Sequence, residues 1–335
     1  MSAAGAGRGA ADRGRPTSGE PRVAVTLGDP RGIGPEVAAA ALAAHPPSDR
    51  FLVFGPTGTR YVAPPSAGVE FRAVGGWSHG DGPEAAGALA ASAIRAAVEA
   101  ALAGEVDALV TAPVDKHAMR LGGSAHAGHT EMLAALTGAP EVAMMMVAER
   151  TRLGGPLRVV LATTHLALAD VPRALSPALL VGQVRLTARG LRAGWRLADP
   201  RIALCAVNPH ASDGGLFGDE EARVFAPALE RLRAEGVRVT GPVPADTVFV
   251  RALRGEFDAV VAPYHDVGMA AFKTASFGLG VNVTLGLPFP RTSPDHGTAI
   301  DIAGRGVADP TSMREAIGLA ARLAMRGWEV GGDAA

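Results

Sequence analysis

Residues 22–44 of the chain read RVAVTLGDPRGIGPEVAAAALAA, a short apolar run followed by a glycine-rich turn and an alanine-rich stretch. The run over residues 22–27 predicts a buried strand, because it is short and rich in aliphatic and β-branched side chains. Pro35 stands where a helix over residues 35–44 would begin, and proline is favoured in the first helical turn. A strand that leads directly into a helix is the repeating unit of parallel α/β sheets.

The same order of strand, turn and helix recurs along the rest of the chain. Buried strands are predicted over residues 106–111, 157–163, 202–207, 258–262 and 281–285. Helices are predicted over residues 84–102, 130–136, 177–197, 220–235 and 312–325. The pattern indicates an α/β fold with a mostly parallel sheet. No linker marks a boundary between lobes, so we expect a discontinuous domain.

Composition excludes several classes of partner. The 335 residues carry a net charge of −1 and a pI near 6.8, so the chain has no cationic surplus with which to bind nucleic acid or a membrane surface. Residues 1–20 are rich in Gly, Ala and Arg without an apolar core segment, which predicts a disordered tail and not a secretion signal. We therefore expect a cytoplasmic protein. The single cysteine, Cys205, lies in an apolar run and is expected to be a buried free thiol.

Three predicted strands are each followed by a histidine. The segments are Thr164-His165, Asn208-Pro209-His210 and Tyr264-His265-Asp266. Ligands of open α/β sheets bind at the carboxyl edge of the strands, so these imidazoles can meet there. Three neutral imidazoles suit a catalytic divalent metal, with Zn²⁺ the usual occupant and Co²⁺, Mn²⁺ or Ni²⁺ also suitable. Asp246 and Asp266 are candidates to orient them, and the alternative is that each histidine only caps a loop.

The segment AGHTE, residues 127–131, directly precedes a predicted helix. It places His129 and Thr130 where the backbone N–H groups of a helix start attract phosphate or carboxylate. The alternative is a plain N-cap by the Thr130 hydroxyl. We expect an anionic part of a ligand here.

Residues 272–301 form the longest motif, FKTASFGLGVNVTLGLPFPRTSPDHGTAID. So many glycines and prolines over this length indicate that the backbone approaches a ligand. Lys273 and Arg291 can neutralise a phosphate, and Asn282 and His296 lie between and beyond them. No G-x-G-x-x-G sequence joins a strand to a helix, so the Rossmann dinucleotide fingerprint is absent from the sequence.

Lysine is scarce in this chain, where Lys116 and Lys273 are the only two among 32 basic residues. Lysine offers a compact and titratable charge, whereas arginine stays protonated. A lysine retained against this background suggests a site that requires it, and chance retention is the alternative.

Eight motifs occur in order between Val23 and Gly306, namely GDPRGIGPE, TAPVDK, AGHTE, ATTHLAL, NPHASDGG, GPVPADT, YHDVGM and GVNVTLGLPFPRTSPDHGTA. Together they resemble the 4-hydroxythreonine-4-phosphate dehydrogenase (PdxA) family of vitamin B6 synthesis. The resemblance implies a two-lobed α/β/α fold like that of isocitrate and isopropylmalate dehydrogenases, with residues 21–330 as one catalytic unit of two interleaved lobes. It also implies an active site in the interlobe cleft, shared between the subunits of a homodimer.

The resemblance further implies roles for individual residues. The metal ligands would be His165, His210 and His265, drawn from both subunits. The substrate contacts would be His129, Thr130, Lys273, Asn282 and Arg291. The loop with His296, Gly297 and Thr298 resembles the adenosine-binding loop of the decarboxylating dehydrogenases. Lys116 is by analogy the candidate proton shuttle, and Asp246 and Asp266 would act beside the metal.

The implied reaction oxidises the secondary alcohol of 4-phosphooxy-L-threonine with NAD or NADP and then releases CO₂ to give 3-amino-2-oxopropyl phosphate. One divalent ion per site, Zn, Co, Mn, Ni or Mg, would assist. Val267 stands where the family usually has Gln, so threonate or erythronate 4-phosphate, or a cis-dihydrodiol carboxylate, is an alternative substrate. A phosphotransacetylase-like acyltransferase, a metal-dependent hydrolase and a non-catalytic binding protein are alternatives of other classes.

Overall fold

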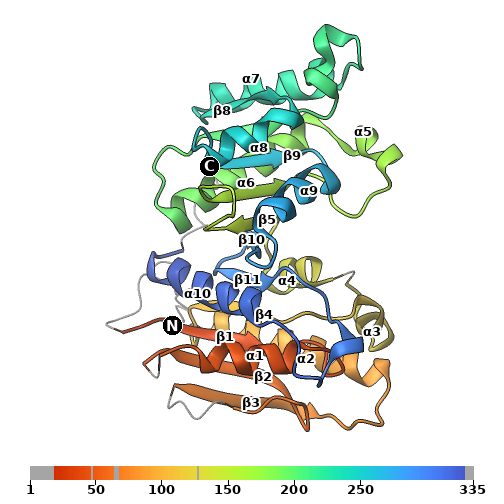
Figure 1. The fold of residues 1–335 in the computed structure, drawn as a ribbon, viewed down its shortest axis with the longest axis vertical. Coiled ribbons are helices and arrows are strands. Elements are labelled where there is room, and N and C mark those ends of the chain that lie inside the picture. Colours follow the sequence, from red (N-terminus) through yellow and green to blue (C-terminus); the bar gives the residue numbers. More distant parts are fainter. Residues whose placement is uncertain (1–18, 47, 64–67, 127, 329–335) are drawn as a thin grey trace, which may run out of the picture.

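The computed structural model of the chain describes residues 19–46, 48–63, 68–126 and 128–328. Its strands form one eleven-stranded sheet in the order β3-β2-β1-β4-β11-β10-β5-β6-β9-β7-β8 (Figure 1). The strands are β1 (Arg22–Thr26), β2 (Arg50–Thr57), β3 (Val69–Gly76), β4 (Ala108–Thr111), β5 (Ala143–Ala148), β6 (Leu157–Leu161), β7 (Ile202–Cys205), β8 (Val239–Val243), β9 (Ala259–Ala262), β10 (Val281–Leu285) and β11 (Arg291–Pro294).

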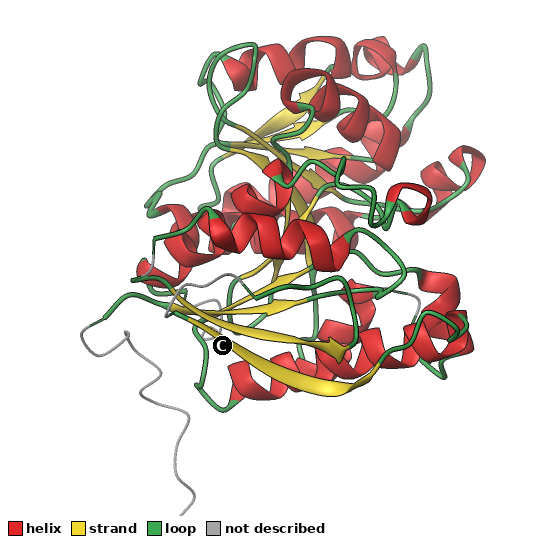
Figure 2. Cartoon of the chain, turned by 60° about the horizontal axis from the view of Figure 1, so that its bottom comes forward, coloured by secondary structure: helices red, strands yellow, loops and turns green. Residues whose placement is uncertain are grey.

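Helices cover both faces of this sheet (Figure 2). The α-helices are α1 (Gly34–Ala43), α2 (Pro83–Leu102), α3 (Lys116–Leu121), α4 (His129–Thr137), α5 (Val171–Ala174), α6 (Pro177–Trp195), α7 (Ala226–Ala234), α8 (Ala245–Leu253), α9 (His265–Ser276) and α10 (Thr311–Met325). Shorter helical segments are η1 (Leu168–Asp170), η2 (Pro209–Gly215), η3 (Glu221–Phe225) and η4 (Ile300–Ile302). In β1, Val23 and Val25 pack with α1 and α10, whereas Ala24 packs with α2 on the opposite face. The molecule is therefore an α/β/α sandwich, as the sequence predicts.

Two parallel halves of the sheet meet through antiparallel pairs. Strands β3, β2, β1, β4 and β11 run parallel to one another, and so do β6, β9, β7 and β8. Between them β10 is antiparallel to both β11 and β5, and β5 is antiparallel to β6. The chain builds the first half, then the second, and returns to the first with β11 and α10. This return explains why the sequence shows no single boundary between lobes.

Helix α2 is long and apolar enough, by length and composition, to cross a membrane. Half of its apolar window is buried, and the helix contacts β1, β2, β4 and α3. Its burial and its contacts are those of a core helix in a globular protein. Cys205 is likewise buried, and burial raises the pKa of its thiol to about 12, so the expected inert thiol is confirmed.

Two predictions concern the first residues of the chain and residues 272–301. The disordered tail predicted over residues 1–20 falls almost wholly on residues 1–18, which lie outside the described residues. Residues 272–301, whose glycines and prolines predict a close approach of the backbone to a ligand, include the predicted strand over residues 281–285, which is confirmed as β10. They contain the end of α9 and the strands β10 and β11, because those strands pair with β5 and β4 from distant parts of the chain.

Candidate active site

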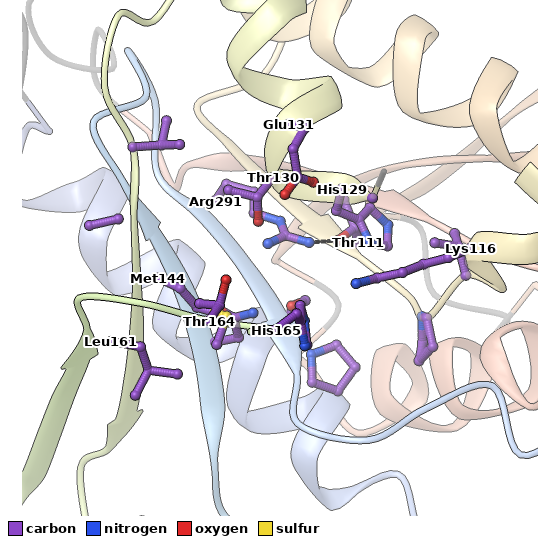
Figure 3. Close-up of a pocket in the computed structure, with 18 of the residues that line it drawn as sticks. Thr111, Lys116, His129, Thr130, Glu131, Met144, Leu161, Thr164, His165 and Arg291 are labelled. Carbon is purple, nitrogen blue, oxygen red and sulfur yellow. Dashed lines mark hydrogen bonds between the residues drawn. The ribbon is translucent and has the colours of Figure 1, made fainter. Parts of the chain in front are cut away.

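A cavity of about 410 Å³ lies over one face of the middle of the sheet (Figure 3). Strand alternation explains why its floor is polar. Arg291 and Ser293 are two residues apart on β11, and Asn282 of β10 is paired with Ser293, so all three side chains lie on one face. Thr111 at the end of β4 and His165 beyond β6 complete opposite walls.

Arg291 is the central charge of the cavity and is only 1% exposed. Its guanidinium donates hydrogen bonds to the hydroxyls of Thr284 (2.9 Å) and Thr111, while its Nε has no partner among the described residues. Burial without a carboxylate partner lowers the pKa of Arg291 to about 9. An anion that enters the cavity would relieve this cost, so the arrangement favours an anionic ligand.

Helix α4 begins beside Arg291, and its first turn has no side-chain cap. Gly128 occupies the N-cap position and Thr130 lies inside the helix, so the alternative of a plain N-cap by Thr130 is wrong. The Nε2 atom of His129 and Oδ1 of Asn282 are shielded from solvent, and neither has a hydrogen-bond partner in the part of the chain that the structure describes. Shielding lowers the pKa of His129 well below its ordinary value, helped by Arg291 and Lys116. Unpaired polar atoms are rare in protein interiors, and here they indicate a ligand.

Lys116 is the first residue of α3, and charged neighbours fix the start of that helix. The Asp115 carboxylate accepts hydrogen bonds from two backbone N–H groups of the first turn, at 2.8 and 3.2 Å. Arg31 joins Asp115 (3.0 Å) to the buried carboxylate of Asp29 (2.7 Å). Partial burial would raise the pKa of Asp115, but the backbone donors and Arg31 hold it below its ordinary value.

Close packing of α2 against α3 also fixes Lys116. A Cβ on Gly87 of α2 would lie 1.9 Å from the carbonyl oxygen of Ala118, so only glycine allows the two backbones to approach in this way. Lys116 then extends across the cavity toward the wall that carries His165 (Figure 3). Its ammonium adds a second positive charge to that of Arg291.

The strands that precede the three predicted metal ligands are neighbours in the sheet, in the order β6-β9-β7, and run parallel. We call His165, His265 and His210, which follow them, the histidine rim. The rings of His165 and His265 lie side by side, with centroids 5.8 Å apart. Nδ1 of His265 lies 2.7 Å from Oδ1 of Asp266, a contact that leaves Nε2 available to a metal.

His210 does not join the other two imidazoles within this chain. It lines a separate cavity of about 340 Å³ together with Asp246 and Tyr264. Among the residues that the structure describes, no group of three or more His, Cys, Asp or Glu side chains is placed to hold one metal ion. Partial burial lowers the pKa of His165, and Lys116 adds to this effect, which favours the neutral imidazole that binds a metal.

Lys273 also lies apart from the cavity lining. Its Nζ is 3.1 Å from the carboxylate of Asp295 and donates to the Asp295 backbone oxygen at 3.3 Å. Burial raises the pKa of Asp295, although Lys273 opposes the shift. The assignment of Lys273 to substrate binding stays a prediction.

The loop predicted to hold the cofactor borders the cavity. His296 and Gly297 line it, and Nε2 of His296 is shielded without a partner among the described residues. Thr298 lies behind them, where its backbone oxygen accepts a hydrogen bond from the N–H of Ile33 (2.9 Å). The glycine-rich turn after β1 thus supports this loop. A Cβ on Gly32 would lie 2.6 Å from the same oxygen, so the two loops touch closely.

Several lining residues carry polar groups that sequence reasoning did not assign, namely Thr111, Glu131, Thr164, Gln183 and Ser293. Glu131 is the one carboxylate among the residues that line the described cavity. It stands three residues after Gly128 in the AGHTE segment, on the first turn of α4, so its position was signalled by the motif. Thr111 and Ser293 lie on strands, so the sheet register places them on the cavity face, whereas Thr164 follows β6 directly before His165.

Comparison with known proteins adds the family. Residues 57–320 match the family model described as pyridoxal phosphate biosynthetic protein PdxA. The chain belongs to this family. The 4-hydroxythreonine-4-phosphate dehydrogenase of Desulfosudis oleivorans is 44% identical over 328 residues, 90% of this chain and 95% of that protein. The D-threonate 4-phosphate dehydrogenase of Cupriavidus necator is 43% identical over 334 residues, 91% of this chain and 98% of that protein.

Solved structures place this PdxA-family chain in the expected fold. The 4-hydroxythreonine-4-phosphate dehydrogenase from Klebsiella pneumoniae matches with a TM-score of 0.81 at 38% identity, covering 92% of this chain and all of that one. An isocitrate dehydrogenase from Methylococcus capsulatus shares the fold at a TM-score of 0.50 and 14% identity, over 90% of this chain and 87% of that one. The predicted family and fold class are confirmed. The acyltransferase and hydrolase alternatives gain no support from these dehydrogenase relatives.

Proposed function

We propose that this PdxA-family chain oxidises 4-phosphooxy-L-threonine with NAD and releases CO₂ and 3-amino-2-oxopropyl phosphate, in the synthesis of pyridoxal 5'-phosphate. The observation that carries the proposal is the cavity over the middle of the sheet, where buried Arg291 has no anionic partner among the described residues. The relatives named 4-hydroxythreonine-4-phosphate dehydrogenase support the same substrate.

The charges of the substrate complement those of the cavity. Phosphate and carboxylate groups would be bound by Arg291 and the open first turn of α4. The substrate ammonium would be bound by Glu131. Held at both ends, the substrate places its carbinol carbon at a fixed distance from the cofactor.

The histidine rim fits a divalent cation by its donor set. Two adjacent imidazoles, one of them hydrogen-bonded to Asp266, suit Zn²⁺, Co²⁺, Mn²⁺ or Ni²⁺ better than Mg²⁺, which prefers oxygen ligands. A bound cation would supply Lewis-acid polarisation of the substrate oxygen. His165 lines the substrate cavity as well, so the rim adjoins the place where that oxygen would lie.

Lys116 serves as the proton carrier in this proposal. Lys116 would take the hydroxyl proton on its amine nitrogen, while the nicotinamide would supply a hydride acceptor for the carbinol carbon. The bond to CO₂ then breaks and leaves its electron pair on the adjacent carbon, to which Lys116 returns the proton. The sequence yields NADH, CO₂ and the amino ketone without net release of a proton. The cofactor would lie along the loop of His296, Gly297 and Thr298. Nε2 of His296 is shielded there and has no hydrogen-bond partner among the described residues.

A homodimer would complete the metal site. His210 lines a different cavity from His165, so a second copy of the chain would bring the third imidazole to the other two. Leu168, which lines a cavity with His165 and His265, is 67% exposed, and Leu216, six residues after His210, is 71% exposed, as at a surface that another chain covers. The test mixes inactive His165→Ala and His210→Ala chains after unfolding and refolding together. Recovered activity supports a shared site, and a monomeric, fully active protein contradicts it.

The proposed reaction is tested by a screen for NADH and NADPH formation. We expect turnover of 4-phosphooxy-L-threonine with NAD, its loss on treatment with EDTA, and its return with Zn²⁺, Co²⁺, Mn²⁺ or Ni²⁺. The matched control is the unphosphorylated analogue, 4-hydroxy-L-threonine, which should not react. Full activity in metal-free protein, or no nicotinamide reduction with any phosphorylated hydroxy acid, would contradict the proposal.

D-threonate 4-phosphate is the second candidate substrate. The Cupriavidus necator relative, which is 43% identical to this chain, is named for this substrate. Threonate carries a hydroxyl where threonine carries an ammonium, so it would leave the Glu131 carboxylate without a cationic partner. We therefore expect the threonine substrate to give the higher kcat/KM, and the opposite order would reverse the assignment.

A further inference from the structure

The chain turns left-handed soon after β7, beginning at His210. The φ angles of His210, Ala211, Ser212 and Asp213 are 52°, 56°, 70° and 44°, in a region that residues with a side chain rarely occupy. Four such residues in succession cost free energy at each position. This strain persists only where neighbouring groups fix it, and it is concentrated at functional sites.

Glu221 is the neighbouring group that fixes this turn. It is only 5% exposed, and its carboxylate accepts four hydrogen bonds from the segment around the turn. Oε1 accepts from the N–H groups of Val207 (2.9 Å) and Asn208 (2.8 Å). Oε2 accepts from Nδ2 of Asn208 (2.9 Å) and from the hydroxyl of Ser212. One carboxylate therefore binds the chain on both sides of His210.

The adjacent glutamate makes a weaker connection to the same segment. Glu220 accepts one hydrogen bond there among the described residues, from Nδ2 of Asn208 at 2.7 Å. Glu221 is also the first residue of η3, a π-helical segment, and such segments are rare and often found at functional sites. The two neighbours thus share charge and sequence position, but only Glu221 contacts the turn itself.

We propose that Glu221 is a positioning residue for metal binding, which holds the left-handed turn in the geometry that presents the His210 imidazole to the divalent cation. The inference rests on the metal site of the proposed function and goes beyond it, because Glu221 lines neither the substrate cavity nor the cavity of His210. The substitution Glu221→Gln keeps the side-chain shape but replaces one acceptor oxygen by an N–H donor. That donor would face Asn208 Nδ2 and the Ser212 hydroxyl, or the two backbone N–H groups.

The test measures Co²⁺ affinity of the full-length chain by absorption spectroscopy, together with NADH formation. We expect Glu221→Gln to weaken Co²⁺ binding by about 10- to 100-fold, the range found when a group that orients a metal ligand is removed. Turnover should recover at saturating Co²⁺, because the chemistry itself is intact. Glu220→Gln is the matched control and should change the affinity by no more than about twofold. A folded Glu221→Gln protein with unchanged Co²⁺ affinity, or a defect that saturating Co²⁺ leaves uncorrected, overturns the inference.

A double-mutant cycle separates this inference from the proposed function. With His210→Ala present, Glu221→Gln should weaken Co²⁺ binding no further, since both act through the same imidazole. Additive losses overturn the positioning role. If His210→Ala leaves Co²⁺ affinity unchanged, the proposed metal site itself is wrong; if His210→Ala weakens binding and Glu221→Gln does not, only the inference is wrong.

A milder variant covers the case in which Glu221→Gln does not fold. Ser212→Ala removes one of the four donors and should weaken Co²⁺ binding in the same direction, by about threefold. Unchanged affinity in a folded Ser212→Ala protein then overturns the inference.

Discussion

The substrate cavity and the histidine rim are built in different ways. The cavity over β4, β10 and β11 is lined by side chains that the sheet aims, and Arg291 at its centre is buried. The rim follows the ends of β6, β9 and β7, and His165 and His210 there are exposed. A sheet fixes side-chain directions by its register, whereas a loop needs added contacts such as those of Asp266 and Glu221.

This difference concerns how much of each site lies within one chain, among its described residues. The cavity brings its cations, its carboxylate and its shielded polar atoms together within a single chain. The rim brings two imidazoles together and leaves the third in another cavity. Substrate recognition is therefore expected to depend on the sheet of each chain, and metal binding on loops and on assembly.

The largest expected effect concerns Lys116, which lies between the two regions. Lys116→Arg replaces an amine that can accept and return a proton by a guanidinium that stays protonated. We expect kcat to fall by about 10²- to 10⁴-fold, the usual contribution of general acid–base catalysis. Arg120→Lys, on the exposed face of the same helix, is the control and should retain full turnover. Wild-type kcat in the Lys116→Arg protein would remove the proton-carrier role.

A second prediction sets Arg291 against another buried arginine, Arg158. Arg158 is paired with Glu149 (3.3 Å) and packs over the Trp195 ring at 5.1 Å, whereas the partners of Arg291 in the described part of the chain are hydroxyls. Arg291→Met should lower kcat/KM by about 100-fold, mainly through KM, with little loss of Tm, because it removes an unpaired buried charge. Arg158→Met should lower the free energy of unfolding by about 2 kcal/mol with KM unchanged. Equal effects of the two variants on KM would contradict the assignment of Arg291 to the substrate site and of Arg158 to the stability of the fold.

The smallest expected effect concerns substrate choice at Glu131. Glu131→Gln removes the negative charge that would pair with the substrate ammonium. The preference for 4-phosphooxy-L-threonine over D-threonate 4-phosphate, measured as a ratio of kcat/KM values, should fall by about tenfold. The threonate substrate serves as the internal control, since it lacks the ammonium. An unchanged ratio would mean that the ammonium is recognised elsewhere.

Much of the fold could be predicted from local sequence pattern. The strand over residues 22–27 and the helix over residues 35–44 correspond to β1 and α1, because a β-branched run and a proline-led alanine helix are local signals. Strand β5 was missed because its sequence AMMMVA has no β-branched alternation. Strand β11 was missed because RTSP contains an arginine and a proline, and it becomes a strand only through its partners β4 and β10.

Candidate site residues could be predicted where they directly follow a strand in the sequence. Their arrangement in space depends on the order of the strands in the sheet and could not be predicted. His165, His210 and His265 could be found from sequence, but the order β6-β9-β7 that makes their strands neighbours could not. Arg291 was found as a candidate anion ligand, yet its burial on β11 comes from sheet register. Lys273 was expected beside it and instead contacts Asp295, because α9 extends through Ser276 and directs that side chain elsewhere.

We expect one substrate molecule to span the cavity and the histidine rim. The most direct test is the absorption spectrum of the Co²⁺-loaded protein during titration with 4-phosphooxy-L-threonine. We expect a saturable change in the Co²⁺ absorption bands. In the Arg291→Met protein the midpoint of this titration should shift to about 100-fold higher substrate concentration. A Co²⁺ spectrum that stays unchanged at substrate concentrations that saturate turnover would contradict it.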